Sequence, residues 1–154
     1  MLLRTHFMFN FFIFLLFLKL EVIVLSFPVF LVFFLATMLP DIDIPGSFIS
    51  KHTKPLSNFI HIFIGHREEF HSLVFAFLLS IVVWLISRNY LLTGVCFLFY
   101  FLHLLLDSLS PFGIKWFWPL KWKTSGKIKT GKLGDALVFL IFSLASVLLI
   151  ILMI

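Results

Sequence analysis

Two pairs of residues have types and spacings that suit a metal ion. His103 and Asp107 are four residues apart, so on a helix both side chains project from one face and can hold an ion between them. Asp41 and Asp43 lie between two prolines, and an extended or turn backbone there would present two carboxylates from a rigid loop. Imidazole and carboxylate ligands without thiolates suit zinc, manganese or iron.

Further candidates accompany these pairs. His66 and His71 are five residues apart at a junction between a loop and an apolar segment. Such a set is large enough for one or two divalent ions, and two ions about 3.5–4 Å apart suit phosphoester hydrolysis. Arg67 would then bind the anionic oxygen of the substrate. We predict these metal ligands: His6, Asp41, Asp43, His66, His71, His103 and Asp107. The predicted catalytic residues are Asp41, His71 and Asp107. Any of the predicted carboxylates or His71 could serve as the general base, and Asp135 is a further possible site residue.

The elements that position these residues are membrane segments. Of the 154 residues, 62% are hydrophobic and 12% are charged, and the mean hydropathy is +1.16. This composition excludes an ordinary soluble domain, a disordered chain and a disulfide-stapled secreted module. A spanning helix needs about 20 mostly apolar residues. The sequence predicts one all-α membrane domain over residues 1–154, a bundle of about five segments near residues 3–19, 22–39, 70–87, 90–109 and 134–154.

The basic residues predict the topology of this bundle. If the segments alternate, only Lys19 and Arg88 of the 12 Lys and Arg residues fall on one side. Basic residues stay on the cytoplasmic side of a membrane, so we expect the N-terminus and both long loops there, and the C-terminus outside if there are five spans. The candidate ligands fall at the cytoplasmic ends of the segments. They can therefore converge on one polar site at that interface.

The order of the motifs is also informative. They are Thr5-His6, Leu39-Pro40-Asp41-Ile42-Asp43, Gly65-His66-Arg67, His71-Ser72, His103, Asp107, Ser110-Pro111, Gly113, Trp118-Pro119, Gly131 and Asp135. In this order they resemble the YdjM-like family of membrane-bound metal-dependent hydrolases, also described as LexA-binding, inner-membrane-associated hydrolases. The resemblance covers nearly the whole chain and implies that the seven predicted ligands form the metal and catalytic set. The chain departs from the family by having Glu68-Glu69-Phe70 in place of Gly-x-Thr, and Asp135 where the family tends to carry Glu.

The predicted function is metal-dependent hydrolysis at the inner membrane. A site at the level of the lipid head groups favours a lipid or lipid-linked phosphoester as substrate, with membrane lipid as the partner and no direct binding of nucleic acid. The alternative is a non-enzymatic membrane protein that binds or carries a metal ion or a proton through the same residues. Carriers usually hold ionisable groups near the middle of the bilayer, so grouping at one interface favours the enzyme. A weaker third interpretation is a scaffold whose lysine-rich loop recruits a partner.

Overall fold

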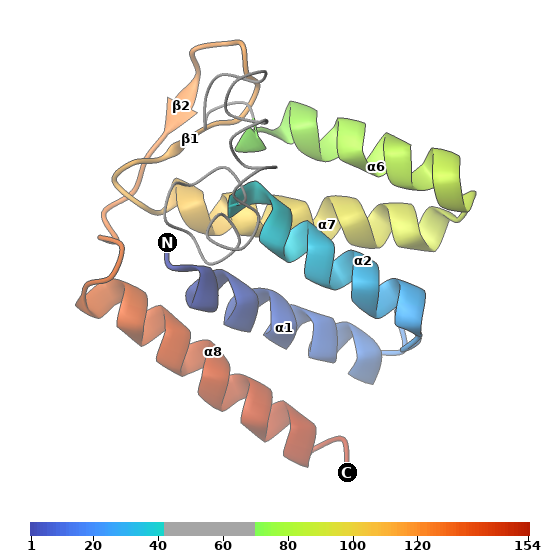
Figure 1. The fold of residues 1–154 in the computed structure, drawn as a ribbon. Helices are drawn as coiled ribbons and strands as arrows, with labels where there is room; N and C mark the ends of the chain where they lie inside the picture. The colour runs from blue at the N-terminus through green and yellow to red at the C-terminus, as the bar shows by residue number, and fades with distance from the viewer. Residues whose placement is uncertain (42–69) are drawn as a thin grey trace, which may run out of the picture.

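The computed structural model describes residues 1–41 and 70–154, which are mostly helical (Figure 1). The helices within these residues are α1 Leu3–Lys19, α2 Phe27–Met38, α6 Leu73–Ser87, α7 Tyr90–Ser108 and α8 Leu133–Ile151, with a short 3₁₀ helix η1 at Leu39–Asp41. Of these, α7 and α8 are long and apolar enough to cross a membrane, and α2 with η1 and α6 are shorter apolar helices. The predicted helical architecture is confirmed, whereas the five spans stay a prediction.

The second predicted segment begins later than expected, at Phe27 instead of residue 22. The chain leaves α1 through Glu21, which has a positive φ of 56°. The backbone N–H groups of Glu21 and Val22 donate to the carbonyls of Leu18 and Phe17, a Schellman-type helix end. Residues 20–26 are therefore used in turning the chain, and Pro28 occupies the first turn of α2, where its missing N–H is harmless.

The other predicted segments shift only at their ends. The third begins at Leu73 instead of residue 70 because the Ser72 hydroxyl caps the helix by accepting from the Phe75 N–H. Between α6 and α7, Arg88 adopts a left-handed conformation and the Asn89 side chain accepts from the first N–H groups of α7. The fourth and fifth segments end at Ser108 and Ile151, close to their predicted limits.

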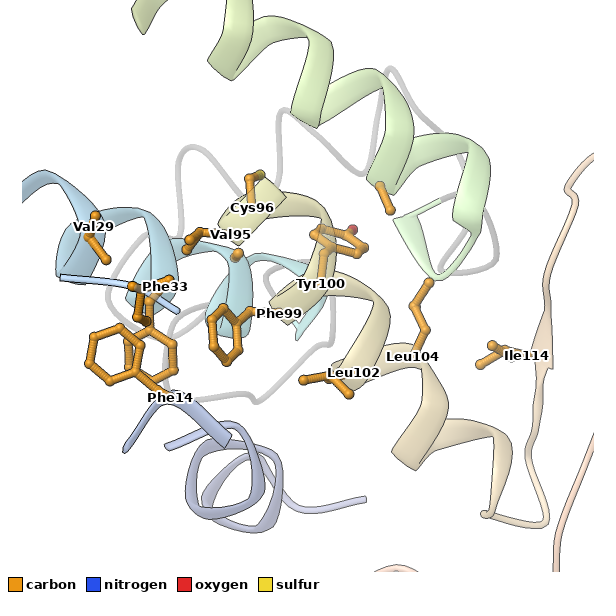
Figure 2. Packing of buried hydrophobic residues seen from close by; sticks show 13 residues of the cluster. Phe14, Val29, Phe33, Val95, Cys96, Phe99, Tyr100, Leu102, Leu104 and Ile114 are labelled. Atoms are coloured by element: carbon orange, nitrogen blue, oxygen red, sulfur yellow. The ribbon is translucent and has the colours of Figure 1, made fainter. Parts of the chain in front are cut away.

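Helix α7 lies at the centre of the packing, between α2 and α6, while α1 contacts α2 and α7 and carries α8 against it (Figure 1). Phenylalanines from three helices meet where α1, α2 and α7 converge (Figure 2). The Phe14 and Phe33 ring centroids lie 4.4 Å apart, and Phe99 meets Phe33 edge-on at 4.9 Å. Buried aromatic pairs of this kind contribute about 0.5–1.5 kcal/mol beyond their burial. They fix the helices whose far ends carry the polar residues.

A two-stranded antiparallel ribbon follows α7, formed by β1 Ile114–Lys115 and β2 Lys123–Thr124. The sequence predicts only a polar loop here, because two-residue strands are too short to show alternation. Backbone bonds fasten the ribbon to the helices: the Leu73 N–H donates to the Trp116 carbonyl at 2.8 Å, and the Gly126 N–H donates to the Ser110 carbonyl at 2.9 Å. The ribbon therefore lies at the end of the bundle where α7 finishes and α6 begins (Figure 1).

Candidate metal centre

Four side chains from three separate elements converge at this end of the bundle. Asp41 ends η1, His71 lies just before α6, and His103 and Asp107 belong to α7. Each offers one ligand atom, and these four atoms all lie within 4.8 Å of one another. The convergence requires α2, α6 and α7 to pack side by side, which the core beneath them ensures.

The distances within the cluster suit a divalent ion. The His71 Nε2 lies 3.4 Å from the Asp107 Oδ2 and 3.7 Å from the Asp41 Oδ1. The His103 Nε2 lies 3.6 Å from the Asp41 Oδ1 and 3.7 Å from the Asp107 Oδ2. Ligands about 2.1 Å from a tetrahedral ion are about 3.4 Å apart. The four distances between a nitrogen and an oxygen are therefore close to the spacing of ligands that share one ion.

All four residues are buried, which makes their polar atoms costly to leave unsatisfied. The Asp41 Oδ1 and the His103 Nε2 have no hydrogen-bond partner among residues 1–41 and 70–154. A carboxylate oxygen and an imidazole nitrogen that both point into one buried space are suited to accept a cation. The donor set therefore fits a metal ion.

The tautomer of His103 is set from outside the cluster. Its Nδ1 lies 2.9 Å from the Thr37 carbonyl oxygen, and a carbonyl can only accept. The Nδ1 must therefore carry the proton, which leaves the Nε2 lone pair directed at the cluster. Histidine ligands are commonly oriented in this way. Thr37 is held in turn by Asn10, whose Nδ2 donates to the Thr37 Oγ1 at 3.0 Å and to the Phe99 carbonyl at 2.9 Å.

Sequence reasoning missed Asn10 and Thr37. The signal was present, because a side-chain amide at the centre of the phenylalanine-rich run 7–17 needs partners once it is buried. Both side chains are fully buried, and together they tie α1 and α2 to α7.

Replacing Asn10 with Leu is expected to lower the affinity for metal about tenfold, the lower end of the range for residues behind metal ligands. The substitution leaves Thr37 without its amide partner and loosens the carbonyl that orients His103. A competition titration with a chromophoric chelator measures the affinity. The matched control is Ser146→Ala, which removes a buried hydroxyl that donates to the Phe142 carbonyl within α8. Equal affinities for Asn10→Leu and Ser146→Ala would contradict the positioning role.

His71 responds strongly to its two carboxylate neighbours. Burial lowers its pKa, but close contact with the carboxylates of Asp107 and Asp41 and their negative charges outweighs this effect and raises the pKa to about 9. The imidazole of the metal-free protein therefore carries a proton at neutral pH and balances one of the carboxylates. A metal ion that binds here must displace that proton.

The second oxygen of Asp107 faces a different group. Its Oδ1 lies 3.1 Å from the Nε2 of His6 and also contacts the amino group of Met1. The fully buried His6 ring stacks on His103, with centroids 3.8 Å apart and planes 6° from parallel. His6 is thus adjacent to the cluster but is not one of its four members.

Asp135, a further possible site residue, is not one of the four clustered residues. It is fully buried, and its Oδ2 accepts from the backbone N–H of Gly131 at 2.7 Å and from that of Leu2 at 3.3 Å. It therefore ties the start of α1 to the segment that leads into α8, outside the four-residue cluster. Three predicted site residues lie outside the described residues: the ligands Asp43 and His66, and the anion-binding residue Arg67.

Comparison with known proteins identifies relatives of this chain. A profile of the YdjM inner membrane protein family matches residues 1–154. The inner membrane proteins YdjM of Escherichia coli (strain K12) and Shigella flexneri are each 36% identical to the chain over 110 residues, which cover 67% of this chain and 55% of each relative. The chain thus spans about half the length of these curated relatives, and no solved structure matches it. The match over its whole length shows that this chain belongs to the YdjM inner membrane protein family.

Proposed function

We propose that this protein is a membrane-bound, metal-dependent hydrolase of phosphoesters. The observation that carries the proposal is the cluster of four ligand atoms within 4.8 Å of one another, from Asp41, His71, His103 and Asp107. Family membership supports the location in the inner membrane. The position of the cluster at the ends of the helices, away from their middles, supports an enzyme at the interface over a carrier.

The residues of the cluster differ in their exposure to the neighbouring cavity, and this difference suggests different roles. His71 and Asp107 line a cavity beside the cluster, so they face the side from which a substrate and water arrive. His103 is fully buried and anchored through its Nδ1, so its role is to hold the ion. Catalytic zinc sites commonly use three protein ligands and leave one position open. A fourth residue at the cavity, His71 through its Nε2 or Asp107 through a carboxylate oxygen, is then available to accept a proton from water.

A divalent ion held by these side chains would polarise the phosphoester and lower the pKa of a water molecule toward neutrality. Zinc, manganese and iron suit the two imidazoles and two carboxylates. One ion fits the four-residue cluster. A second would need His6 and the Oδ1 of Asp107, which lie 3.1 Å apart, together with further ligands. The substrate class that we propose is a lipid or lipid-linked phosphoester, reached from the cytoplasmic side of a five-span bundle.

Metal content tests this proposal. The protein is purified in detergent without chelators or an affinity metal, and its elements are measured beside those of the His71→Ala/Asp107→Ala variant. We expect one or two equivalents of zinc, manganese or iron per chain, and their loss from a variant that still elutes as a folded species. His52→Ala/His61→Ala is the matched control, because neither histidine belongs to the predicted ligand set. Absence of metal from the unmodified protein, even after reloading with each ion, would overturn the proposed function.

A further inference from the structure

An open groove of about 230 Å³ lies at the start of α7, at the opposite end of this helix from the metal centre (Figure 1). Phe17 of α1 and the turn residues Val22 and Ile23 form one wall, and residues 90–98 of α7 contribute the other. The Tyr90 hydroxyl is the only polar side-chain group among the lining residues. The groove therefore suits an apolar ligand.

The groove follows the axis of α7. Its lining positions on this helix are one, three or four residues apart and so share one face: Tyr90, Leu91, Gly94, Val95 and Leu98. At 1.5 Å per residue this face extends for about 12 Å. Gly94 keeps the space open, because a Cβ there would meet no atom within 4 Å. Since α7 is long and apolar enough to cross a membrane, the groove runs from the helix end toward the middle of the bilayer, as lipid acyl chains do.

The volume of the groove also suits a single chain. One water molecule needs roughly 10–15 Å³ of such space, so the groove has room for roughly 15–20 non-hydrogen atoms. This is the size of one acyl chain of a phospholipid. The membership of this chain in an inner membrane protein family makes acyl chains the apolar matter that surrounds it.

A cationic group lies at the mouth of the groove. The Tyr90 ring, which is 79% exposed, lies 6.5 Å from the ring of Trp84, and the Arg88 Cζ lies 4.8 Å from the centroid of the same Trp84 ring. Among residues 1–41 and 70–154, no carboxylate lies within ion-pair distance of Arg88. Trp and Tyr are typical of the head-group level of a membrane, and a guanidinium can donate two parallel hydrogen bonds to a phosphate.

We propose that this groove holds one acyl chain of an anionic phospholipid whose phosphate contacts Arg88. The lipid bridges the turn after α1 and the first turns of α7, and its negative charge complements the guanidinium at the mouth of the groove. The inference does not depend on the proposed hydrolase activity, because the groove and the metal centre share no residue. It assigns to the protein a lipid site at the end of the bundle that carries no candidate catalytic residue.

The test titrates the delipidated, full-length protein in detergent with dioleoyl phosphatidylglycerol and, separately, with dioleoyl phosphatidylcholine. Native mass spectrometry measures the Kd of the first lipid bound. We expect Arg88→Gln to raise the Kd for phosphatidylglycerol about fivefold, the usual effect of one basic residue beside anionic lipid, and to remove the preference over phosphatidylcholine. Arg4→Gln is the matched control, because Arg4 is also exposed and stacks on an aromatic ring, that of Phe139, but does not lie at the groove. Its Kd should stay within about twofold of that of the unmodified protein.

A second variant tests the chain-binding part of the groove. Gly94→Leu fills the space that the acyl chain needs, and forcing both into one site carries a packing penalty equal to at least about a fivefold rise in Kd for both lipids. Val147→Phe is its control, because it enlarges an exposed side chain of α8 outside the groove. Gly94→Val serves if Gly94→Leu does not fold.

Three outcomes would overturn the proposal. Equal weakening by Arg88→Gln and Arg4→Gln would reduce the effect to diffuse charge. An unchanged Kd in Gly94→Leu would place the lipid elsewhere on the protein. A dimer in the unmodified protein that Gly94→Leu converts to a monomer would show that a second copy of the chain occupies the groove. Failure of the proposed function is distinguishable from all three, because it is read from metal content and leaves lipid binding unaffected.

Discussion

Asp107→Asn is expected to reduce phosphoester turnover by at least about 100-fold. Metal-assisted polarisation contributes several kcal/mol to transition-state stabilisation, and each 1.36 kcal/mol is a tenfold change in rate. The amide keeps the shape of the carboxylate but removes the charge that both His71 and His103 face at 3.4 Å and 3.7 Å. Turnover of p-nitrophenyl phosphate and the metal content of the same preparation together measure the effect.

The control for Asp107→Asn is Glu21→Gln, the same carboxylate-to-amide change in an exposed turn at the opposite end of α1. It should keep the metal content and the rate of the unmodified protein. Thermal melting of each variant in detergent shows whether the chain is still folded. A folded Asp107→Asn protein with full turnover would remove Asp107 from the catalytic machinery and contradict the assignment of the site.

Gly126→Ala is expected to lower the free energy of unfolding by about 1–3 kcal/mol, the usual cost of forcing extra atoms into a packed site. A Cβ at this position would lie 2.2 Å from the carbonyl oxygen and 2.5 Å from the carbonyl carbon of Leu109. Both are backbone atoms at the end of α7, so the clash cannot be relieved by rotating a side chain. For a chain of this length the melting temperature should fall by about 2–12 °C.

Gly94→Ala is the matched control for this prediction. A Cβ added at Gly94 meets no atom within 4 Å, and alanine has a higher helix propensity than glycine by roughly 1 kcal/mol. The melting temperature of Gly94→Ala should therefore stay the same or rise. If both variants melted at the same temperature as the unmodified protein, the tight junction between Gly126 and α7 would be refuted.

Helix positions were largely predictable because hydropathy dominates this sequence. The predicted segment 3–19 coincides with α1, since its limits are set by a long apolar run and by Lys19. The late start of α2 could not be read from hydropathy, because Val22 and Val24 are apolar but belong to the turn. The ribbon was missed for a related reason: its strands form through pairing and through close approach at Gly126, neither of which leaves a periodic pattern.

The candidate site was predictable to the extent that it depends on helix ends. Polar residues at the same end of antiparallel segments must lie near one another, and the structure brings Asp41, His71, His103 and Asp107 together. Which polar residues belong to the cluster, and which make other contacts beside it, could be seen only in the folded structure. Spacing along the chain cannot show that His6 stacks on His103 or that Asp135 bonds to backbone N–H groups.

The spacing of His103 and Asp107 on α7 has a consequence for how a metal ion would enter the proposed centre. The two side chains form a chelating pair on a helix whose conformation is already fixed by the core around Phe99, so capture by this pair costs little chain entropy. Asp41 and His71 come from other elements and can join afterwards. Loading should therefore proceed stepwise, from a weakly held ion on one helix to a fully enclosed one. The last ligands to join then govern how long the ion is retained.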